Sequence, residues 1–184
     1  MGLNPEVSDD ALRAKCRGMK PKININDVDL IAYDFDGVMT DNKVIISENG
    51  KESVVVNRSD GLAISKIKEM KIPQLILSAE INNIVKIRAR KLNIPVLSGV
   101  KDKKNVITSY CNRKNIDLKK VVFVGNDISD SEVMKIVGYP IAPQDAYKII
   151  KEKAILITRA KGGEGVIREL YDILEGKPGH GKNS

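Results

Sequence analysis

The sequence predicts an α/β fold in which helices cover both faces of a parallel sheet. The prediction rests on four short apolar runs, each separated from the next by a segment with helical periodicity. These runs are VDLIAY (28–33), QLILS (74–78), VVFVG (121–125) and AILIT (154–158). Strands that are apolar along their whole length are buried on both faces, which is typical of a parallel sheet sandwiched by helices.

Helices are predicted between these strands from the spacing of apolar residues and from residues that favour helix ends. The first follows a candidate cap at Ser59. The expected ranges are 61–70, 81–92, 103–114, 130–137 and 165–174. Their lengths suit the right-handed crossovers that join parallel strands.

One segment interrupts the alternation directly after the first strand. KVIIS (43–47) and ESVVVN (52–57) flank the sequence ENGK, which predicts a small β-hairpin with a glycine-containing turn. We expect this hairpin, at about 43–57, to hang over the carboxyl end of the first strand. The chain contains no internal repeat or low-complexity linker. It therefore divides into an N-terminal extension (1–27), one domain (28–175) and a flexible C-terminal tail (176–184).

The composition is that of an ordinary soluble domain, with 184 residues, 42% hydrophobic and 30% charged. No run approaches the roughly 18 consecutive apolar residues of a membrane span, and the N-terminus lacks the apolar region of a secretory signal. We therefore expect a cytoplasmic protein without a membrane partner.

Cysteine and histidine usage limits the possible chemistry. Cys16 and Cys111 lie far apart, and their spacing suggests neither a zinc site nor a disulfide framework. His180, the single histidine, lies in the tail, so we expect no serine–histidine or cysteine–histidine mechanism. The chemistry must then use carboxylates, lysines or a metal.

The net charge of +7 is compatible with a nucleic acid, an anionic small substrate or a solvated surface. Proteins that bind nucleic acids usually add aromatic side chains on which bases stack, and this chain has two Phe, five Tyr and no Trp. We therefore expect no nucleic-acid partner and favour an anionic small substrate, with a solvated surface as the alternative.

Acidic side chains follow the first predicted strand. Asp34 and Asp36 are two residues apart, a spacing that in an extended segment places both carboxylates on the same side, and Gly37 permits a sharp exit. The carboxylates would repel one another unless a divalent cation lay between them. A solvated acidic loop is the plain alternative for such a pair on its own.

A second oxygen-rich cluster, GNDISD (125–130), follows another buried strand. Ser78 ends a third strand, and Lys103 and Lys104 open a helix. Since ligands of open α/β sheets bind beyond the carboxyl ends of the strands, these groups are expected to converge there. Together they supply a nucleophile, an acid/base, a cation cage, a hydroxyl donor and a positive charge, which are the parts that phosphoryl transfer needs.

On these residues the chain resembles the haloacid dehalogenase (HAD) superfamily over about 27–175. DFDGVMTD (34–41) is similar to its first motif, and Ser78, Lys103 and GNDISD stand at the second, third and fourth. The resemblance implies that Asp34 is a nucleophile forming an aspartyl-phosphate and that Asp36 is the general acid/base. It implies Mg²⁺ as cofactor and a catalytic role for Lys103. The metal ligands that it implies are Asp34, Asp36, Asn126 and Asp127, with Asp130 supporting them. The phosphate-binding residues that it implies are Asp34, Ser78, Ala79 and Lys103.

The fourth motif departs from the family pattern. It usually begins Gly-Asp-Asp, whereas this chain has Asn126 after Gly125. An asparagine can bind Mg²⁺ through its carbonyl oxygen but contributes less charge than a carboxylate.

Within the superfamily, the short hairpin, the absence of a large cap domain and the segments NRSDGLAI (57–64) and KGGEGVIREL (161–170) resemble the phosphatases of 3-deoxy-octulosonate and nonulosonate phosphates. That resemblance implies a homotetramer in which a neighbouring subunit closes each site. It implies a phosphorylated sugar acid as substrate, contacted by Thr40, Arg58, Ser59, Asp60, Gly61, Glu80, Arg88 and Lys91.

The residues after the second motif indicate which sugar acid is the substrate. Octulosonate 8-phosphate enzymes usually have Thr-Gly-Arg there, whereas this chain has Ser78-Ala79-Glu80. The acidic Glu80 and the basic Arg88 and Lys91 resemble a pattern of one acid and two bases in the nonulosonate enzymes. This favours an N-acylneuraminate 9-phosphate type of substrate, with 3-deoxy-D-manno-octulosonate 8-phosphate as the alternative. A third hypothesis is a non-catalytic oligomerisation module, since the chain is also similar to the C-terminal domain of acylneuraminate cytidylyltransferases. This similarity implies a functional link to a cytidylyltransferase.

Overall fold

The computed structural model describes residues 23–177, and its centre is a six-stranded parallel sheet with the order β5-β4-β1-β6-β7-β8. The strands are β1 (Leu30–Tyr33), β4 (Gln74–Leu77), β5 (Val96–Leu97), β6 (Val121–Val124), β7 (Tyr139–Ala142) and β8 (Leu156–Ile157). The predicted parallel sheet is thereby confirmed. The structure also contains β5 and β7, which the sequence analysis missed because β5 is only two residues long and Pro140 interrupts the apolar run of β7.

The register of the central strands brings the predicted motifs together. In β1, Ile31 pairs with Val122 of β6, and Tyr33 pairs with Val124. The backbone N–H of Asp34 then donates to the carbonyl of Val124 at 2.9 Å. The residues that directly follow β1 and β6 therefore lie side by side at the carboxyl edge of the sheet.

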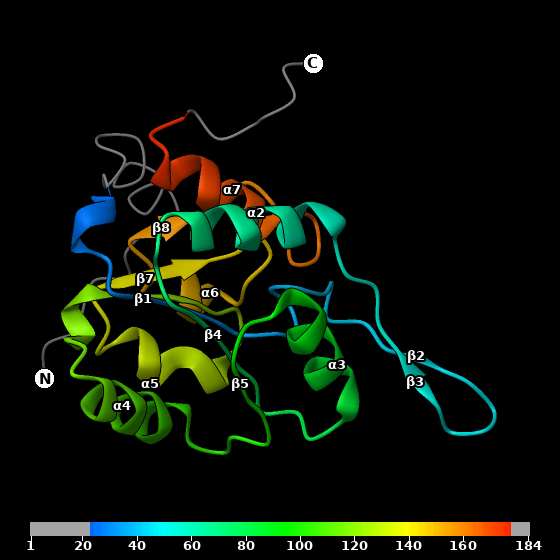
Figure 1. Cartoon of the computed structure of the whole chain (residues 1–184). Coiled ribbons are helices and arrows are strands. Elements are labelled where there is room, and N and C mark those ends of the chain that lie inside the picture. The colour runs from blue at the N-terminus through cyan, green and yellow to red at the C-terminus, as the bar shows by residue number, and fades with distance from the viewer. Residues whose placement is uncertain (1–22, 178–184) are drawn as a thin grey trace, which may run out of the picture.

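Helices cover both faces of the sheet (Figure 1). They are α2 (Arg58–Glu69), α3 (Asn83–Leu92), α4 (Lys103–Lys114), α5 (Ser131–Met134), α6 (Lys148–Lys151) and α7 (Val166–Leu174), with 3-10 turns η1 (Ile25–Asp27), η2 (Leu118–Lys120) and η3 (Ile128–Asp130). α2, α3 and α7 pack on one face, and α4, α5 and α6 on the other. Both layers of the predicted sandwich are therefore present.

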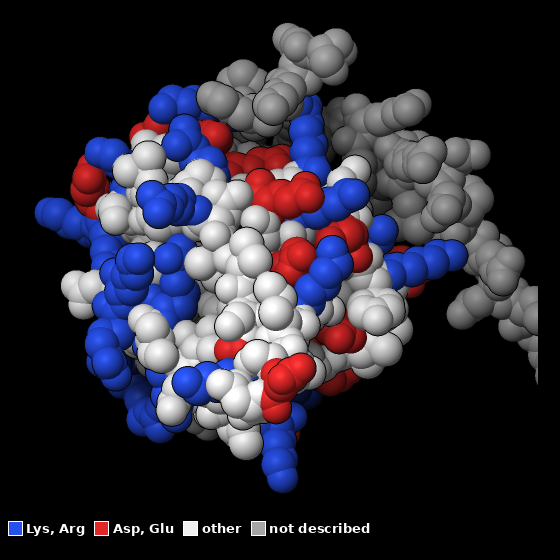
Figure 2. Space-filling model, turned by 90° about the vertical axis from the view of Figure 1, so that its right-hand side faces the viewer, with Lys and Arg blue, Asp and Glu red and all other residues white. Residues whose placement is uncertain are grey.

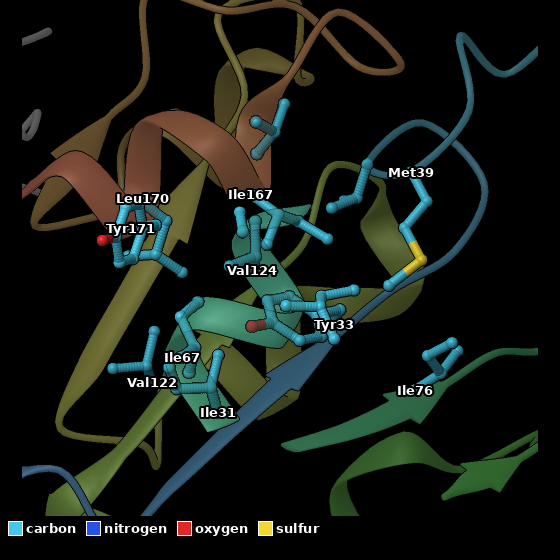
Figure 3. Close-up of a cluster of buried hydrophobic side chains, with 14 of the residues drawn as sticks. Ile31, Tyr33, Met39, Ile67, Ile76, Val122, Val124, Ile167, Leu170 and Tyr171 are labelled. Carbon is cyan, nitrogen blue, oxygen red and sulfur yellow. The ribbon is translucent and has the colours of Figure 1, made fainter. Parts of the chain in front are cut away.

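Alternate residues of each strand supply the two cores. Ile31 and Tyr33 of β1 join the cluster under α2 and α7 (Figure 3), whereas Leu30 and Ala32 join the cluster under α4 and α5. All four are fully buried. This arrangement explains why the strands read as unbroken apolar runs, since each side chain enters one core or the other.

Four of the five predicted helices begin or end at other residues in the structure, and two of them differ by three residues at one end. α2 starts at Arg58 because the side chain of Asn57, not that of Ser59, caps it by accepting the backbone N–H of Ser59 at 2.9 Å. The helix expected over 130–137 is split into η3 and the shorter α5. The split occurs because the Asp130 carboxylate turns back to the loop that precedes it.

The predicted hairpin is confirmed as β2 (Ile45–Ile46) and β3 (Glu52–Ser53), an antiparallel pair that projects from the body of the domain (Figure 1). Its paired part is shorter than the sequence indicates. Within residues 23–177 no larger cap domain is inserted after β1, in agreement with the expectation.

The ends of the described chain refine the expected boundaries. Ile23, assigned to the extension, is 6% exposed and packs in the core. Residues 1–22 of the extension, which include Cys16, and most of the expected tail, which includes His180, lie outside the described residues. Cys111 is buried and free. No helix of the described part is long and apolar enough to cross a bilayer.

Candidate active site

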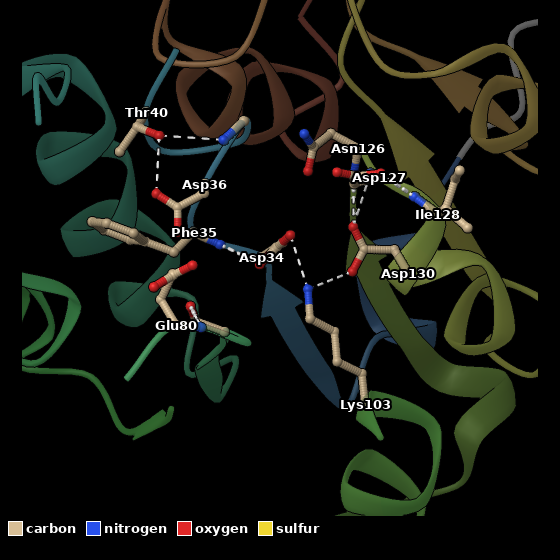
Figure 4. Close-up of polar contacts among 12 residues, drawn as sticks. Asp34, Phe35, Asp36, Thr40, Glu80, Lys103, Asn126, Asp127, Ile128 and Asp130 are labelled. Atoms are coloured by element: carbon tan, nitrogen blue, oxygen red, sulfur yellow. Dashed lines mark hydrogen bonds and ion pairs between the residues drawn. The ribbon is translucent and has the colours of Figure 1, made fainter. Parts of the chain in front are cut away.

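Asp34 occupies the first position beyond β1 and is 5% exposed. Its Oδ1 accepts the backbone N–H of Phe35 at 2.7 Å, and its Oδ2 lies 2.9 Å from Nζ of Lys103 (Figure 4). The carboxylate is thus held in one orientation by a donor on each oxygen.

Lys103 is the first residue of α4 and is 3% exposed, whereas Lys104 is exposed. The ammonium also lies 2.7 Å from Oδ1 of Asp130, so it bridges two buried carboxylates. Burial alone lowers the pKa of Lys103, but Asp34 and Asp130 outweigh it and raise the pKa above its usual value. The structure therefore resolves which lysine of the 103/104 pair faces the site, and this lysine is charged.

Asp130 connects this ion pair to the fourth-motif loop. It is fully buried, and its Oδ2 accepts the backbone N–H groups of Asn126 at 2.9 Å and of Asp127 at 3.2 Å. A Cβ at Gly125 would lie 2.7 Å from the Asp130 carboxyl carbon, so a glycine is required at that close approach. Asp130 thus orients both Lys103 and the loop.

Asn126 carries an unpaired polar atom. Its side chain is 6% exposed, and Oδ1 is buried without a hydrogen-bond partner among the described residues. Gly37, with φ of +80°, allows this approach, because a Cβ there would lie 1.9 Å from Asn126 Nδ2. Buried carbonyl oxygens nearly always have a partner, so an unpaired one beside a buried carboxylate fits a bound cation.

The donor set suits a hard cation. No group of three or more His, Cys, Asp or Glu side chains within residues 23–177 forms a metal site by itself. A cation would therefore need the amide oxygen of Asn126 and a backbone carbonyl in addition to Asp34, and oxygen ligands of this kind suit Mg²⁺. Asp127, the other expected ligand, uses its carboxylate to cap η3 through the N–H of Ile128.

Burial raises the pKa of Asp34 to about 8, with the nearby negative charge of Asp130 adding to the effect and Lys103 opposing it. A carboxyl group attacks phosphorus only when ionised. A cation beside Asp34 would favour the ionised form, which is a second reason that the site fits a divalent metal.

Asp36 faces a different partner from Asp34. It is partly buried, and its Oδ1 accepts the hydroxyl of Thr40 at 3.4 Å. Burial, followed by the charge of Glu80, raises its pKa, which suits a group that must donate a proton near neutral pH. The expected common orientation of the two aspartates is not kept, because β1 ends at Tyr33 and the backbone turns after it (Figure 4).

The second motif lies on the neighbouring strand. Ser78 directly follows β4 and is 1% exposed, and its Oγ accepts the backbone N–H of Glu80 at 3.1 Å. Ala79 and Glu80 are exposed. Because β4 is adjacent to β1, this turn opens at the same edge of the sheet as Asp34.

Several residues expected to contact substrate have other partners. Asp60 is 2% exposed, and its Oδ1 accepts the backbone N–H of Arg168 at 3.0 Å, so it caps the start of α7. Arg88 donates from Nη2 to the carbonyl of Asn57 at 3.0 Å and thereby ties α3 to the start of α2.

The remaining expected substrate residues differ in exposure. Thr40 is fully buried. Ser59 and Gly61 are partly buried in the first turn of α2, where Ser59 Oγ donates to Asn57 Oδ1. Arg58 and Lys91, like Glu80, are exposed and so remain accessible to a ligand.

One further segment near the site enters the sequence analysis only as part of a resemblance and is assigned no role there. Gly162 and Gly163, which precede α7, lie against the backbone of the turn that carries Asp36. The adjacent glycines of KGGEG were the available signal, since paired glycines often mark a close backbone approach.

Known proteins are similar to the chain in sequence. The family model of haloacid dehalogenase-like hydrolases matches residues 23–170. A 3-deoxy-D-manno-octulosonate 8-phosphate phosphatase of Yersinia pestis is 31% identical over 146 residues, covering 79% of this chain and 78% of the relative.

Solved structures share the fold. A protein of Streptomyces avermitilis described as a HAD family hydrolase is 37% identical, with a TM-score of 0.84 over 86% of this chain and 91% of the other. A 3-deoxy-D-manno-octulosonate 8-phosphate phosphatase of Moraxella catarrhalis, in complex with a magnesium ion, a phosphate ion and KDO, is 23% identical, with a TM-score of 0.79 over 92% and 94% of the two chains. The second similarity concerns the fold alone.

Asp60→Asn should change how stability depends on pH. Burial raises the pKa of Asp60 to about 6, above its value in an unfolded chain, so the folded state binds this proton more tightly. The stabilisation is complete below about pH 4 and is lost as the pH rises through 6. Urea titrations give the free energy of unfolding of the unmodified chain and of Asp60→Asn at each pH. We expect the first value minus the second to fall by about 2–3 kcal/mol between pH 4 and pH 7. A difference that stays constant with pH would contradict this assignment.

Proposed function

The chain belongs to the haloacid dehalogenase-like hydrolases, as a phosphomonoester hydrolase, and we propose that it removes phosphate from a 3-deoxy sugar acid, with 3-deoxy-D-manno-octulosonate 8-phosphate as the best-supported substrate. The observation that carries the proposal is the buried Asp34 carboxylate, held 2.9 Å from Lys103 beside the unpaired oxygen of Asn126. The names of the curated relatives support the sugar.

Each polar group of the site has a part in this reaction. Asp34 attacks phosphorus and forms an aspartyl-phosphate, while Asp36 gives a proton to the departing sugar alkoxide. Asp36 then takes a proton from the water that cleaves the aspartyl-phosphate. Lys103, kept in place by Asp130, offsets charge on the transferring phosphoryl oxygens. The exposed turn that begins at Ser78 can donate to the same oxygens.

We propose Mg²⁺ as the cofactor, held by Asp34, the backbone carbonyl of Asp36 and Oδ1 of Asn126. When bound, the ion supplies positive charge that reduces repulsion between the carboxylate and the phosphoryl oxygens. The unpaired oxygen of Asn126 supports this ligand set. Asp127 contributes through its cap on η3, which holds the loop behind Asn126.

A nine-carbon substrate of the N-acylneuraminate 9-phosphate type is the second candidate, and the position of Glu80 favours it. Its exposed carboxylate lies near Asp36, where octulosonate enzymes usually have an arginine, and can accept hydrogen bonds from a substrate (Figure 4). Arg88, expected to grip the substrate carboxylate with Lys91, already donates to Asn57. Of the cations expected to contact the substrate, Lys91 and Arg58 are the two that are exposed.

Phosphate release tests the proposal and separates the two sugars. With Mg²⁺, the purified chain should release phosphate from octulosonate 8-phosphate, and N-acylneuraminate 9-phosphate should be assayed beside it. Asp34→Asn should lower the rate by more than about a thousandfold because it removes the nucleophile. Asp29→Asn, which alters an exposed ion pair with Lys120, is the matched control and should retain the rate. No release from either sugar would reject the proposal in favour of the non-catalytic module linked to a cytidylyltransferase.

Substitutions of Asn126 test the metal site. Asn126→Ala should weaken Mg²⁺ binding about tenfold or more because an oxygen ligand is lost, and Asn126→Asp should tighten it because a charge is added. Isothermal titration calorimetry measures both. Asn112→Ala, on the exposed side of α4, is the control. Equal affinities for the unmodified chain and Asn126→Ala would exclude this residue as a ligand.

We also propose a homotetramer assembled through the hairpin. Ile45, Ile46 and Val55 are 60%, 70% and 64% exposed, and such large apolar side chains are costly to leave in water. The side of the molecule that bears the hairpin has mostly uncharged atoms at its centre, with Lys and Arg gathered at one flank (Figure 2). A centre poor in charged residues with a charged border is typical of a subunit interface.

Charging the hairpin should break this assembly. Ile46→Asp places a carboxylate where we expect an apolar contact, so light scattering after gel filtration should give a mass below that of the unmodified tetramer. Ile149→Asp changes a 43% exposed isoleucine on α6 and should leave the mass unchanged. A tetramer that persists in Ile46→Asp, or an unmodified chain that is monomeric, would refute the role of the hairpin.

A further inference from the structure

The hydroxyl of Thr40 lies at the centre of the turn that carries Asp36. Its Oγ1 accepts the backbone N–H of Gly37 and that of Asn42, both at 3.2 Å. A threonine hydroxyl has two acceptor positions and one proton. Since both acceptor positions are filled, the proton is left for Asp36 Oδ1, which lies 3.4 Å away.

This arrangement distinguishes the two oxygens of Asp36. Oδ1 receives the hydroxyl proton and is therefore the acceptor in the pair. A proton that Asp36 carries for the leaving group must then reside on Oδ2. The hydroxyl thus sets both the rotation of the carboxyl group and the oxygen from which the proton departs.

The turn itself is held by the two glycines that precede α7. The N–H of Gly163 donates to the carbonyl of Val38 at 3.1 Å. A Cβ on Gly162 would lie 2.3 Å from the carbonyl oxygen of Gly37, and one on Gly163 would lie 2.7 Å from the backbone nitrogen of Asp41. Only residues without a side chain allow the two backbones to approach this closely.

The glycine segment is fixed from its other side. Asp145 Oδ1 accepts the N–H of Gly162 at 2.9 Å. Glu169 of α7 accepts the N–H of Arg159 at 2.9 Å and that of Ala160 at 2.8 Å. Because its own position is set by these carboxylates, the segment can act as a brace against the turn.

We propose that Thr40 and Gly162 are positioning residues for Asp36, with Thr40 orienting the carboxyl group and Gly162 supporting the turn. Thr40 thus acts through Asp36 and not through contact with the substrate, consistent with its complete burial. This inference rests on the proposed phosphatase function.

The test compares two leaving groups. A sugar alkoxide needs a proton to depart, whereas the nitrophenolate of p-nitrophenyl phosphate leaves readily without one. In Thr40→Val, the single-turnover rate of sugar release from octulosonate 8-phosphate should fall about tenfold or more, and the single-turnover rate of nitrophenolate release should change less than about threefold. Release of the leaving group is measured because it precedes the hydrolysis of the aspartyl-phosphate, in which both substrates need Asp36 as a base. Thr40→Ser keeps the hydroxyl and should restore the rate of sugar release. Thr108→Val, a partly buried threonine in the middle of α4, should match the unmodified chain on both substrates.

Gly162→Ala provides an independent variant should Thr40→Val fold poorly. The added methyl group must displace the Gly37 carbonyl, so the same selective loss is expected. Equal losses in the single-turnover release of both leaving groups, no recovery in Thr40→Ser, or a raised KM with an unchanged rate of sugar release would overturn the inference while leaving the proposed function standing. An unmodified chain inactive on both substrates would reject the proposed function and this inference with it.

Discussion

The buried bridge from Asp34 through the Lys103 ammonium to Asp130 is the interaction on which the rest of the site depends. It joins the end of β1, the first residue of α4 and the turn after β6. Removing one partner of a buried ion pair typically costs about 3–5 kcal/mol, because the remaining charge is left without compensation. The three elements are therefore held in one arrangement at the edge where a phosphoryl group would bind.

The charge balance of this bridge offers a physical reason for a neutral side chain at position 126. Two carboxylates share one ammonium, and burial with the charge of Asp130 raises the pKa of Asp34 to about 8. A carboxylate at position 126 would add another negative charge to the same pocket. A neutral amide attracts a cation less strongly, but it leaves the site easier to form before the cation arrives.

Polar residues near the motifs do not all serve the ligand. Asp60 caps α7, and Arg88 secures the carbonyl of Asn57 at the start of α2. Both lie where helices meet, and buried backbone groups at helix ends need such partners. Asp60 and Arg88, although close to the motifs in sequence, thus support the helices that frame the site.

The sequence by itself determined four strands of the parallel sheet, the hairpin, the full extent of α4 and the presence of acids at the strand ends. These are local properties, since a strand buried on both faces must be apolar throughout and the motif residues follow the strands directly. Only the tertiary structure decided that Lys103 meets Asp34 and Asp130, and that Asp60 faces α7 instead of a substrate. Such contacts join segments far apart in the chain, and the partner of a buried polar group depends on which side chains packing brings within hydrogen-bonding distance.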